Sequence, residues 1–266
     1  STGIPTKSEQ SDLNIALYGF HGDAPHLVLG ALNIRDCTFT TEWAVRLAEE
    51  LQAVAIVLSD QSQGQARSII DPPPSAPVRA VRKRAQADSG DYLRYSLAAD
   101  DGISPMAIPG TEGCLYTADG LEHNEKGTPS SMPSDHQLQL DKRQRKIANI
   151  DTGEHWAEIR SSGDICIITW GSSSGAAFEA ASRLNLLGKP TRVIAVRLLS
   201  PLPETRMRDA TNGASRILTV EQNHGGQLFH YLHALNLLPV AARMLARPGP
   251  LPIRPGEITN TILEWH

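Results

Sequence analysis

Short apolar runs alternate with helical segments along this chain, and that alternation constrains its fold more than any other feature. In the second half, a strand-length run at 164–169 is followed by a glycine- and serine-rich turn at 171–175 and then by apolar residues at helical spacing. Further strand-length runs lie at 192–196 and 216–220, and a second helical pattern covers 227–236. Repeated strand–turn–helix units predict a doubly wound parallel sheet. We therefore expect a Rossmann-like domain in this half.

The same pattern occurs once in the first half. An apolar run at 26–30 precedes a helical segment that Thr40 or Thr41 can cap, and the following run at 53–58 is rich in valine and isoleucine. Strand, helix and buried strand in this order predict part of a second parallel sheet with both faces covered. The expected fold class is therefore α/β throughout.

A long region with little periodicity separates the two blocks. Residues 105–134 are dense in glycine, proline, threonine and serine, yet they include apolar and aromatic side chains that can anchor a loop. A polar, strongly charged helix is expected at 137–150. We predict two domains, 1–158 with this region as a long loop insertion and 159–266, and we expect the insertion to be ordered and functional.

Composition and charge argue against several classes of function. The 266 residues are 40% hydrophobic, and the net charge of −4 comes without a basic stripe, so neither nucleic acid nor a membrane surface is an expected partner. No apolar run approaches the roughly 20 residues of a membrane span, and no signal-peptide pattern is present. Cys37, Cys114 and Cys166 are too few for a cluster that needs four thiolates, and they suit a reducing compartment. We expect a cytoplasmic protein.

The opening run 1–14 has no hydrophobic period. It contains small hydroxyl residues, a turn-forming Gly3 and a rigid Pro5, followed by an acidic and polar cluster. This composition predicts an ordered loop that leads into a helix. Because backbone N–H groups and hydroxyls are free to point outward from such a loop, it is a candidate site for a negatively charged ligand.

His123 is the strongest candidate for a catalytic side chain. It lies between Glu122 and Glu125 in the irregular loop region, and carboxylates raise the pKa of a histidine when they lie close to it. No histidine in the chain belongs to a recognisable metal-binding spacing. The sequence therefore predicts proton-transfer chemistry at His123 and no metal site.

A serine hydrolase is an alternative from another class. The turn 171–175 approaches the G-x-S-x-G nucleophile elbow, which would make Ser173 the nucleophile, and Ser1 could act as an N-terminal nucleophile. An oxyanion-loop motif of the HGGG type is missing. We weigh this class as the weaker one, and for 171–175 we prefer a tight turn with capping hydroxyls to an anion site.

Several segments, in the same order along the chain, resemble one known family. They lie at 1–14, 18–22, 58–61, 104–110, 120–125, 171–172, 220–224 and 247–252. Together they resemble the C-terminal portion of the α subunit of 2-oxoacid:ferredoxin oxidoreductases, most closely the 2-oxoglutarate type. The resemblance implies the later part of a thiamine pyrimidine-binding-like domain followed by a transketolase-C-terminal-like domain.

The resemblance also implies an activity and its partners. Family members oxidatively decarboxylate 2-oxoglutarate or a related 2-oxoacid to the acyl-CoA and pass electrons to ferredoxin. Thiamine diphosphate and Mg²⁺ would be shared with a β subunit that also carries a 4Fe–4S cluster, with coenzyme A as co-substrate. By resemblance, the loop of Ser1, Thr2, Gly3, Pro5 and Thr6 would bind substrate and cofactor, with Thr2, Gly3 and Thr6 beside the thiamine and the substrate carboxylates.

Some family features are missing from this chain. It lacks the Tyr-Pro-Ile-Thr-Pro segment, the glutamate that activates the aminopyrimidine, and an arginine before the Ser-Thr-Gly run. It also lacks the Gly-Asp-Gly motif of the β subunit, as an α chain should. We expect a companion chain to supply the missing N-terminal half of the α subunit. The alternative is a non-catalytic scaffold or binding subunit, but a scaffold would have no physical need to keep the polar loops.

Overall fold

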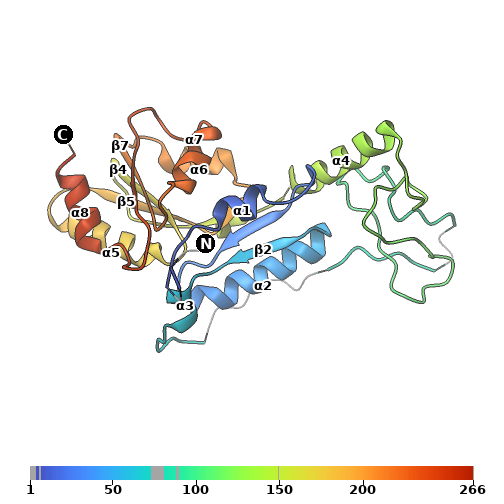
Figure 1. Cartoon of the computed structure of the whole chain (residues 1–266), viewed down its shortest axis with the longest axis horizontal. Helices are drawn as coiled ribbons and strands as arrows, with labels where there is room; N and C mark the ends of the chain where they lie inside the picture. The colour runs from blue at the N-terminus through green and yellow to red at the C-terminus, as the bar shows by residue number, and fades with distance from the viewer. Residues whose placement is uncertain (1–3, 6, 73–80, 88–89, 149, 266) are drawn as a thin grey trace.

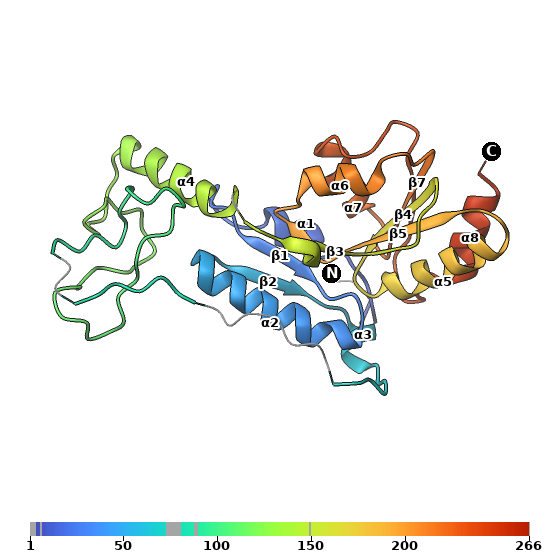
Figure 2. The same cartoon turned by 180° about the vertical axis from the view of Figure 1, so that it is seen from behind.

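A computed structural model describes residues 4–5, 7–72, 81–87, 90–148 and 150–265. Figures 1 and 2 show a body made of two sheets and their helices, from which helix α4 and a set of loops extend to one side. We call this extension, residues 81–148, the arm. In the part of the chain that the structure describes, no helix is both long and apolar enough to cross a membrane.

The first sheet has three strands in the order β2-β1-β6. Strands β1 and β2 are parallel, with Leu27 opposite Ala55, while β6 is antiparallel to β1. Helix α2 packs on β1 and β2, and the short helices α1 and α3 flank the sheet. The bounds are α1 (Leu13–Tyr18), β1 (Leu27–Gly30), α2 (Ile34–Leu51), β2 (Ala55–Leu58), α3 (Gln61–Gln65) and β6 (Leu198–Ser200).

The second sheet has five strands in the order β3-β5-β4-β7-β8, and only β3 is antiparallel to its neighbour. The remaining elements are α4 (Pro133–Ala148), the 3₁₀ helix η1 (Gly153–Trp156), β3 (Ala157–Arg160), β4 (Ile165–Trp170), α5 (Ser173–Leu186), β5 (Thr191–Val196), α6 (Glu204–Thr211), β7 (Arg216–Glu221), α7 (Gln227–Ala234), β8 (Arg243–Ala246) and α8 (Pro255–Leu263).

Two hydrophobic clusters hold the body together. One lies between the second sheet and helices α5 and α8, where Ile167, Leu184 and Ile258 are fully buried. The other joins the opposite face of that sheet to the first sheet and α2, and it includes Trp43 and Ile168. Since one continuous core spans both sheets, their relative position is fixed by apolar burial.

The α/β fold class is confirmed, and the predicted strands and helices of both blocks are present within a few residues. Two local expectations were wrong. Helix α2 begins at Ile34, and its cap is Asn33, whose side chain accepts a hydrogen bond from Asp36 N, because an extended Asn is a strong N-cap. Thr40 lies inside that helix and donates to Asp36 Oδ2.

The second wrong expectation concerns β2, which was predicted to be buried on both faces. Its residues are only partly buried, and Val57 is 37% exposed, because β2 lies at the edge of its sheet. In addition, the first sheet is not purely parallel, because β6 from the second half returns to it. The division at residue 158, which falls within β3, stays a prediction.

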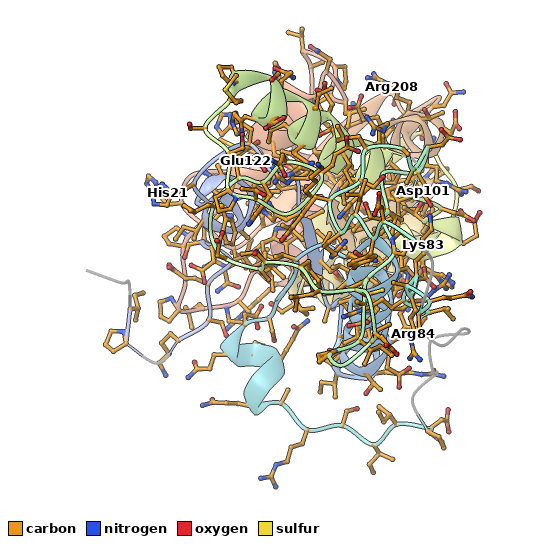
Figure 3. The ribbon with its side chains drawn as sticks, turned by 90° about the vertical axis from the view of Figure 1, so that its right-hand side faces the viewer. His21, Lys83, Arg84, Asp101, Glu122 and Arg208 are labelled. Atoms are coloured by element: carbon orange, nitrogen blue, oxygen red, sulfur yellow. The ribbon has the colours of Figure 1, made fainter. Side chains whose placement is uncertain are left out.

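The long loop region is ordered around α4. Gln139 Nε2 donates to Tyr95 O at 2.9 Å, and Glu125 Oε1 accepts from Leu97 N at 2.8 Å. Residues 122–130 form a loop that is closed by the hydrogen bond from Ser130 N to Glu122 O and has a turn at 124–127. Figure 3 looks onto the end of the arm, where Lys83 Nζ lies 3.5 Å from Asp101 Oδ2. These contacts give the region a defined conformation, while its place as a functional loop insertion of the first domain stays a prediction.

Candidate functional site

A segment of the N-terminal run lies across the carboxyl ends of β4 and β7. We call residues 7–12 the strap. Gln10 N donates to Gln222 O at 2.8 Å, so the strap follows the backbone just after β7. In open parallel sheets ligands bind at this edge, outside the carboxyl ends of the strands. The polar run and the sheet edge thus meet in space, although Gln10 is 160 residues from Trp170 at the end of β4 and 212 from Gln222 after β7.

The side chain of Gln10 is the centre of this contact. Its Nε2 donates to Trp170 O at 2.7 Å, and its Oε1 accepts from Ser173 Oγ at 2.9 Å and from Gln222 N at 2.7 Å. Gln10 is only 3% exposed. Buried amides are stable where their groups are hydrogen-bonded, so these contacts fix the strap to both β4 and β7.

The turn after β4 is shaped to receive this glutamine. Gly171 has φ +61°, a conformation that favours glycine, and a Cβ at this position would lie 2.6 Å from Gln10 Nε2. Ser174 Oγ donates back to Gly171 O at 2.7 Å. The 171–175 segment is thus a tight turn filled by protein groups, as we preferred over an anion site.

This arrangement also bears on the hydrolase alternative. Ser173 is buried, and its hydroxyl donates to a glutamine amide rather than to a histidine. A nucleophilic serine needs a base within hydrogen-bond reach. The geometry around Ser173 therefore gives the hydrolase alternative no support.

Further hydrogen bonds hold the rest of the strap. Gln222 Nε2 donates to Ser8 O at 3.0 Å, and Glu9 Oε1 accepts from Gly249 N at 3.0 Å. At the far end, Gln227 Nε2 donates to Ser11 O at 2.8 Å. The strap is consequently fastened along its length to three separate segments of the second domain.

Glu221, the last residue of β7, supports the same edge from inside. Its carboxylate accepts from Leu228 N and Phe229 N in the first turn of α7, and from Asn223 Nδ2. The helix cap residue Gly226 has no side chain, so this buried acid performs the capping. Burial raises the pKa of Glu221, while these hydrogen bonds act in the opposite direction.

A small cleft opens beside the strap, between the carboxyl ends of the two sheets. It is lined by Glu9 and Gln10 from the strap, by Ser59 and Asp60 after β2, and by Gly171 after β4. Asp60 caps α3 by accepting from Gln63 N. Both sheets therefore contribute their carboxyl ends to one polar cleft at the end of the strap.

The predicted binding residues begin just before this strap. Pro5 is exposed, five residues ahead of Gln10. Ser1, Thr2, Gly3 and Thr6 lie outside the described residues. The strap, which follows these residues, anchors the predicted binding loop. The binding roles of Ser1, Thr2, Gly3, Pro5 and Thr6 stay predictions.

The structure does not bring His123 to the strap. His123 lies in the arm, next to Glu122, which Arg143 of α4 holds by two hydrogen bonds. It is 3% exposed and stacks on Tyr95, with ring centroids 4.5 Å apart and an interplanar angle of 4°. Its Nε2 lies 3.1 Å from Asp119 Oδ1 but at an angle that makes no hydrogen bond. The catalytic role of His123 therefore stays a prediction.

The carboxylate of Glu122, next to His123, interacts with side chains of α4 and not with the imidazole of His123. It receives two hydrogen bonds from Arg143, at 2.9 and 2.6 Å, and lies 2.8 Å from His136 Nδ1. Burial alone would raise the pKa of Glu122, but these partners lower it to about 2. Its side-chain charge thus serves to fasten the turn to α4.

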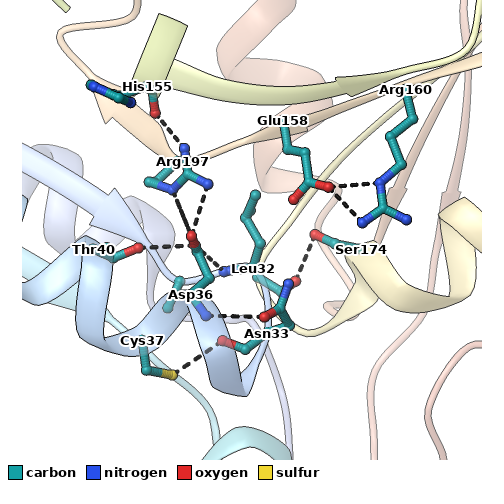
Figure 4. Close-up of polar contacts among 12 residues, drawn as sticks. Leu32, Asn33, Asp36, Cys37, Thr40, His155, Glu158, Arg160, Ser174 and Arg197 are labelled. Atoms are coloured by element: carbon teal, nitrogen blue, oxygen red, sulfur yellow. Dashed lines mark hydrogen bonds and ion pairs between the residues drawn. The ribbon is translucent and has the colours of Figure 1, made fainter. Parts of the chain in front are cut away.

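A buried ion pair that the sequence did not reveal joins the two sheets. Arg197, between β5 and β6, donates to both carboxylate oxygens of Asp36 in the first turn of α2, with contacts of 2.8–3.1 Å (Figure 4). Arg197 Nη1 also donates to His155 O, and Phe39 lies under the guanidinium at 5.1 Å. The pair borders a cavity of about 410 Å³. No sequence motif pointed to it, because the partners are 161 residues apart.

The chemistry of the described residues offers no metal site. Across the described ranges, no group of three or more histidine, cysteine, aspartate or glutamate side chains lies close enough to hold a metal ion. Cys114 and Cys166 are buried and Cys37 is partly exposed, and all three are free thiols.

Comparison with known proteins defines the class of this chain. Residues 1–142 match the family described as "Pyruvate flavodoxin/ferredoxin oxidoreductase, thiamine diP-bdg", and residues 138–248 match "Transketolase, C-terminal domain". The chain thus pairs a thiamine diphosphate-binding type of domain with a transketolase C-terminal type of domain, in the order that the sequence predicted.

Individual relatives extend the match over the chain. It is 32% identical to the 2-oxoacid:ferredoxin oxidoreductase subunit alpha of Saccharolobus solfataricus, over 85% of the chain and 37% of that protein. It is 30% identical to the 2-oxoglutarate synthase subunit KorA of Methanothermobacter marburgensis, over 99% of the chain and 70% of that protein.

One solved structure is similar over nearly the whole chain. It is described as "2-oxoglutarate:ferredoxin oxidoreductase from Magnetococcus marinus with 2-oxoglutarate, coenzyme A and succinyl-CoA bound", with 34% identity and a TM-score of 0.85 over 99% of this chain and 46% of that one. The chain belongs to the 2-oxoacid:ferredoxin oxidoreductase family, as the resemblance predicted. It spans less than half the length of the Saccharolobus relative and of the solved chain.

Proposed function

We propose that this chain is the C-terminal portion of the α subunit of a thiamine diphosphate-dependent oxidoreductase. The enzyme would oxidatively decarboxylate 2-oxoglutarate, or a related 2-oxoacid, to the acyl-CoA and pass the electrons to ferredoxin. The observation that carries this proposal is the match over 99% of the chain to the Magnetococcus enzyme, which is described with 2-oxoglutarate, coenzyme A and succinyl-CoA bound. The position of the strap at the carboxyl edge of the second sheet, where ligands bind in open parallel sheets, also supports it.

The chain's own residues would position the substrate loop. Gln10, Ser173 and Gln222 hold the strap at the carboxyl edge, so the preceding Thr2, Gly3 and Thr6 would lie near the cleft. Hydroxyl and backbone N–H groups there can bind a substrate carboxylate as charge-assisted donors. Thiamine diphosphate supplies the electron sink on which decarboxylation depends.

The remaining parts of the site would come from partners. A β subunit would hold the pyrophosphate, the Mg²⁺ ion and a 4Fe–4S cluster, and ferredoxin would receive the electrons. We place this assembly in the cytoplasm, without a nucleic-acid or membrane partner, in agreement with three free cysteines.

A substitution at Thr6 in the assembled complex tests the proposed site. Thr6→Ala should lower kcat/KM for the 2-oxoacid about ten- to hundredfold, because one hydrogen bond to a charged group is worth about 1.5–3 kcal/mol. The matched control is Thr6→Ser, which keeps the hydroxyl and should retain most of the activity. If kcat/KM of Thr6→Ala were unchanged, neither Thr6 nor its loop would bind the substrate, and the proposed site would be wrong.

We also propose a catalytic role for His123, as a proton-transfer group. The arm would bring it to a site shared with another subunit. His123→Phe keeps an aromatic ring against Tyr95 and removes the titratable nitrogens. It should lower kcat without changing assembly, and the pH dependence of kcat should lose one ionisation. A variant with the parental kcat and pH profile would show that His123 only packs in the arm.

A further inference from the structure

A lysine is buried where the arm meets the body. Lys142 of α4 is 4% exposed, and its Nζ donates to Ser104 Oγ at 2.5 Å. Ser104 is fully buried as well, and its hydroxyl donates onward to Ser96 O at 3.0 Å. A charged ammonium group has three N–H donors and no acceptor, so one hydroxyl satisfies it only in part. The surroundings of Lys142 therefore favour its neutral amine, which is a nucleophile.

Two further cations of this joint, both half-buried, donate to uncharged oxygens. Lys146 Nζ donates to Gln52 O at 3.3 Å, and Arg94 Nη2 donates to Gln52 Oε1 at 2.7 Å. Gln52 Nε2 in turn donates to Ser104 O at 3.0 Å, which links both cations to the residue that Lys142 contacts. Buried cations are normally paired with anions. In the part of the chain that the structure describes, this joint thus gathers positive charge on neutral acceptors.

Two carboxylates act on the lysines of this joint from neighbouring segments, and each has other partners. Glu125 accepts from Leu97 N at 2.8 Å. Asp101 accepts from Ile103 N at 2.8 Å and lies 3.5 Å from Lys83 Nζ. Burial, assisted by the neighbouring cations, lowers the pKa of the buried amine from 10.5 to about 7. Much of this amine is therefore neutral near pH 7.

We propose that the Lys142 amine takes up carbon dioxide as a carbamate, whose carboxylate pairs with Lys146 and Arg94. The amine nitrogen forms a bond to the CO₂ carbon, one C=O π bond opens onto oxygen, and the proton that leaves the nitrogen passes to water. The step involves no change of oxidation state. The inference rests on the proposed function for its source of the gas, since oxidative decarboxylation releases CO₂ from the 2-oxoacid. The remaining cation near the amine, Arg143, is already paired with Glu122.

The burial of Lys142 decides which electrophile can react with it. An amine that is 4% exposed is closed to a 2-oxoacid or an acyl-CoA, whereas CO₂ is a small linear molecule without a charge to desolvate. Because lysine carries its amine on a flexible four-carbon stem, the nitrogen can move away from Ser104 when it holds the new carboxylate. A negative charge nearby favours the charged forms of Lys146 and Arg94. The carbamate would thus strengthen the joint between α4 and the end of α2.

Isotope trapping tests this site on the complex that contains the chain, purified from its own cells. The complex is equilibrated with ¹³C-bicarbonate near pH 8, and an alkylating oxonium reagent then converts carbamates into stable esters. Peptide fragmentation in the mass spectrometer assigns the label to individual lysines. Lys142 should carry at least about tenfold more label than the exposed Lys126, because an ordinary lysine is almost fully protonated at this pH. Near pH 5, where Lys142 is protonated as well, its label should fall at least about tenfold.

Two variants and an assay of turnover complete the test. Lys142→Met should lose the label, while Lys126→Met should leave the label on Lys142 unchanged. No label on Lys142 of the unsubstituted complex, or equal labelling of Lys142 and Lys126, would overturn the inference. Because bicarbonate supplies the CO₂, the labelling does not depend on catalysis. Turnover of 2-oxoacid by a complex without the carbamate would leave the proposed function intact, and a labelled Lys142 in a complex without turnover would refute the function alone.

Discussion

The buried side chain of Gln10 makes the central contacts between the strap and the second domain. Its amide bonds to groups that follow β4 and β7, and Gly171 leaves the space that it needs. Nothing in the sequence distinguishes this glutamine from the polar residues around it, because its partners lie about 160 and 212 positions away. The predicted loop could be recognised from composition, but its anchor could not.

Replacing Gln10 should loosen the strap. Gln10→Ala leaves Trp170 O and Gln222 N without their partner, and we expect the free energy of unfolding to fall by about 1–3 kcal/mol. Urea unfolding of the free chain measures this change. The exposed Gln65 provides the control, since Gln65→Ala should leave the stability within about 0.5 kcal/mol. Equal stability of both variants would contradict the anchoring role.

The pair of Asp36 and Arg197 should be sensitive to the loss of one partner. Their side chains are 10% and 9% exposed, so Arg197→Met leaves a carboxylate buried without its cation. We expect a loss of about 3–5 kcal/mol in the free energy of unfolding. The exposed pair of Arg183 and Glu179 is the comparison, and Arg183→Met should cost less than about 1 kcal/mol. Similar losses in the two variants would argue against the burial of the first pair.

At the scale of elements, the joint between α4 and the body depends on Gln52, which ends α2 in a left-handed conformation. Gln52 Nε2 donates to Ser104 O, its Oε1 accepts from Arg94, and its backbone oxygen accepts from Lys146 Nζ at 3.3 Å. The arm therefore meets the body through these polar contacts and through Ile147, which belongs to the core shared with α2. The long region 105–134 carried too little periodicity to predict such contacts, although its anchoring side chains indicated order.

Lys142 on α4 should make stability depend on pH. Burial, with help from the nearby Lys146, Arg94 and Arg143, lowers its pKa from 10.5 to about 7. Between these values the unfolded chain binds the proton more strongly, so the stability of the protein should rise as pH increases from 7 to 10.

Comparison with Lys142→Met isolates this contribution. The variant has no proton to lose at this site, so its advantage over the parent should be largest near pH 7 and shrink toward pH 10. Urea unfolding at both pH values tests this, with the exposed Lys126→Met as the control. A constant difference between Lys142→Met and the parent would contradict the lowered pKa.

The strands show where sequence patterns succeed and where they fail. β4, β5 and β7 were predicted because runs of five or six residues rich in β-branched and apolar side chains are typical of buried parallel strands. β3, β6 and β8 have three or four residues and include charges or a serine, so no period could be read from them. The return of β6 to the first sheet depends on pairing with β1, which is about 170 residues away and has no local signature.

At the scale of the whole molecule, two sheets share one core and bring their carboxyl ends to the same polar cleft. The family could be predicted from ordered sequence segments, and the comparisons confirm it. The geometry of the proposed catalytic site could not be derived from this chain. Thr2, Gly3 and Thr6 lie outside the described residues, and His123 lies in the arm, away from the strap.

The most direct test of the central claim is an anaerobic assay of the complex that contains this chain, purified from its own cells. With 2-oxoglutarate, coenzyme A and oxidised ferredoxin, we predict that each succinyl-CoA formed is accompanied by the transfer of two electrons to ferredoxin. This turnover should be lost when thiamine diphosphate is removed and regained on its return. Related 2-oxoacids are assayed in parallel. A complex loaded with thiamine diphosphate that turns over none of them would contradict the account and identify the chain as a scaffold subunit.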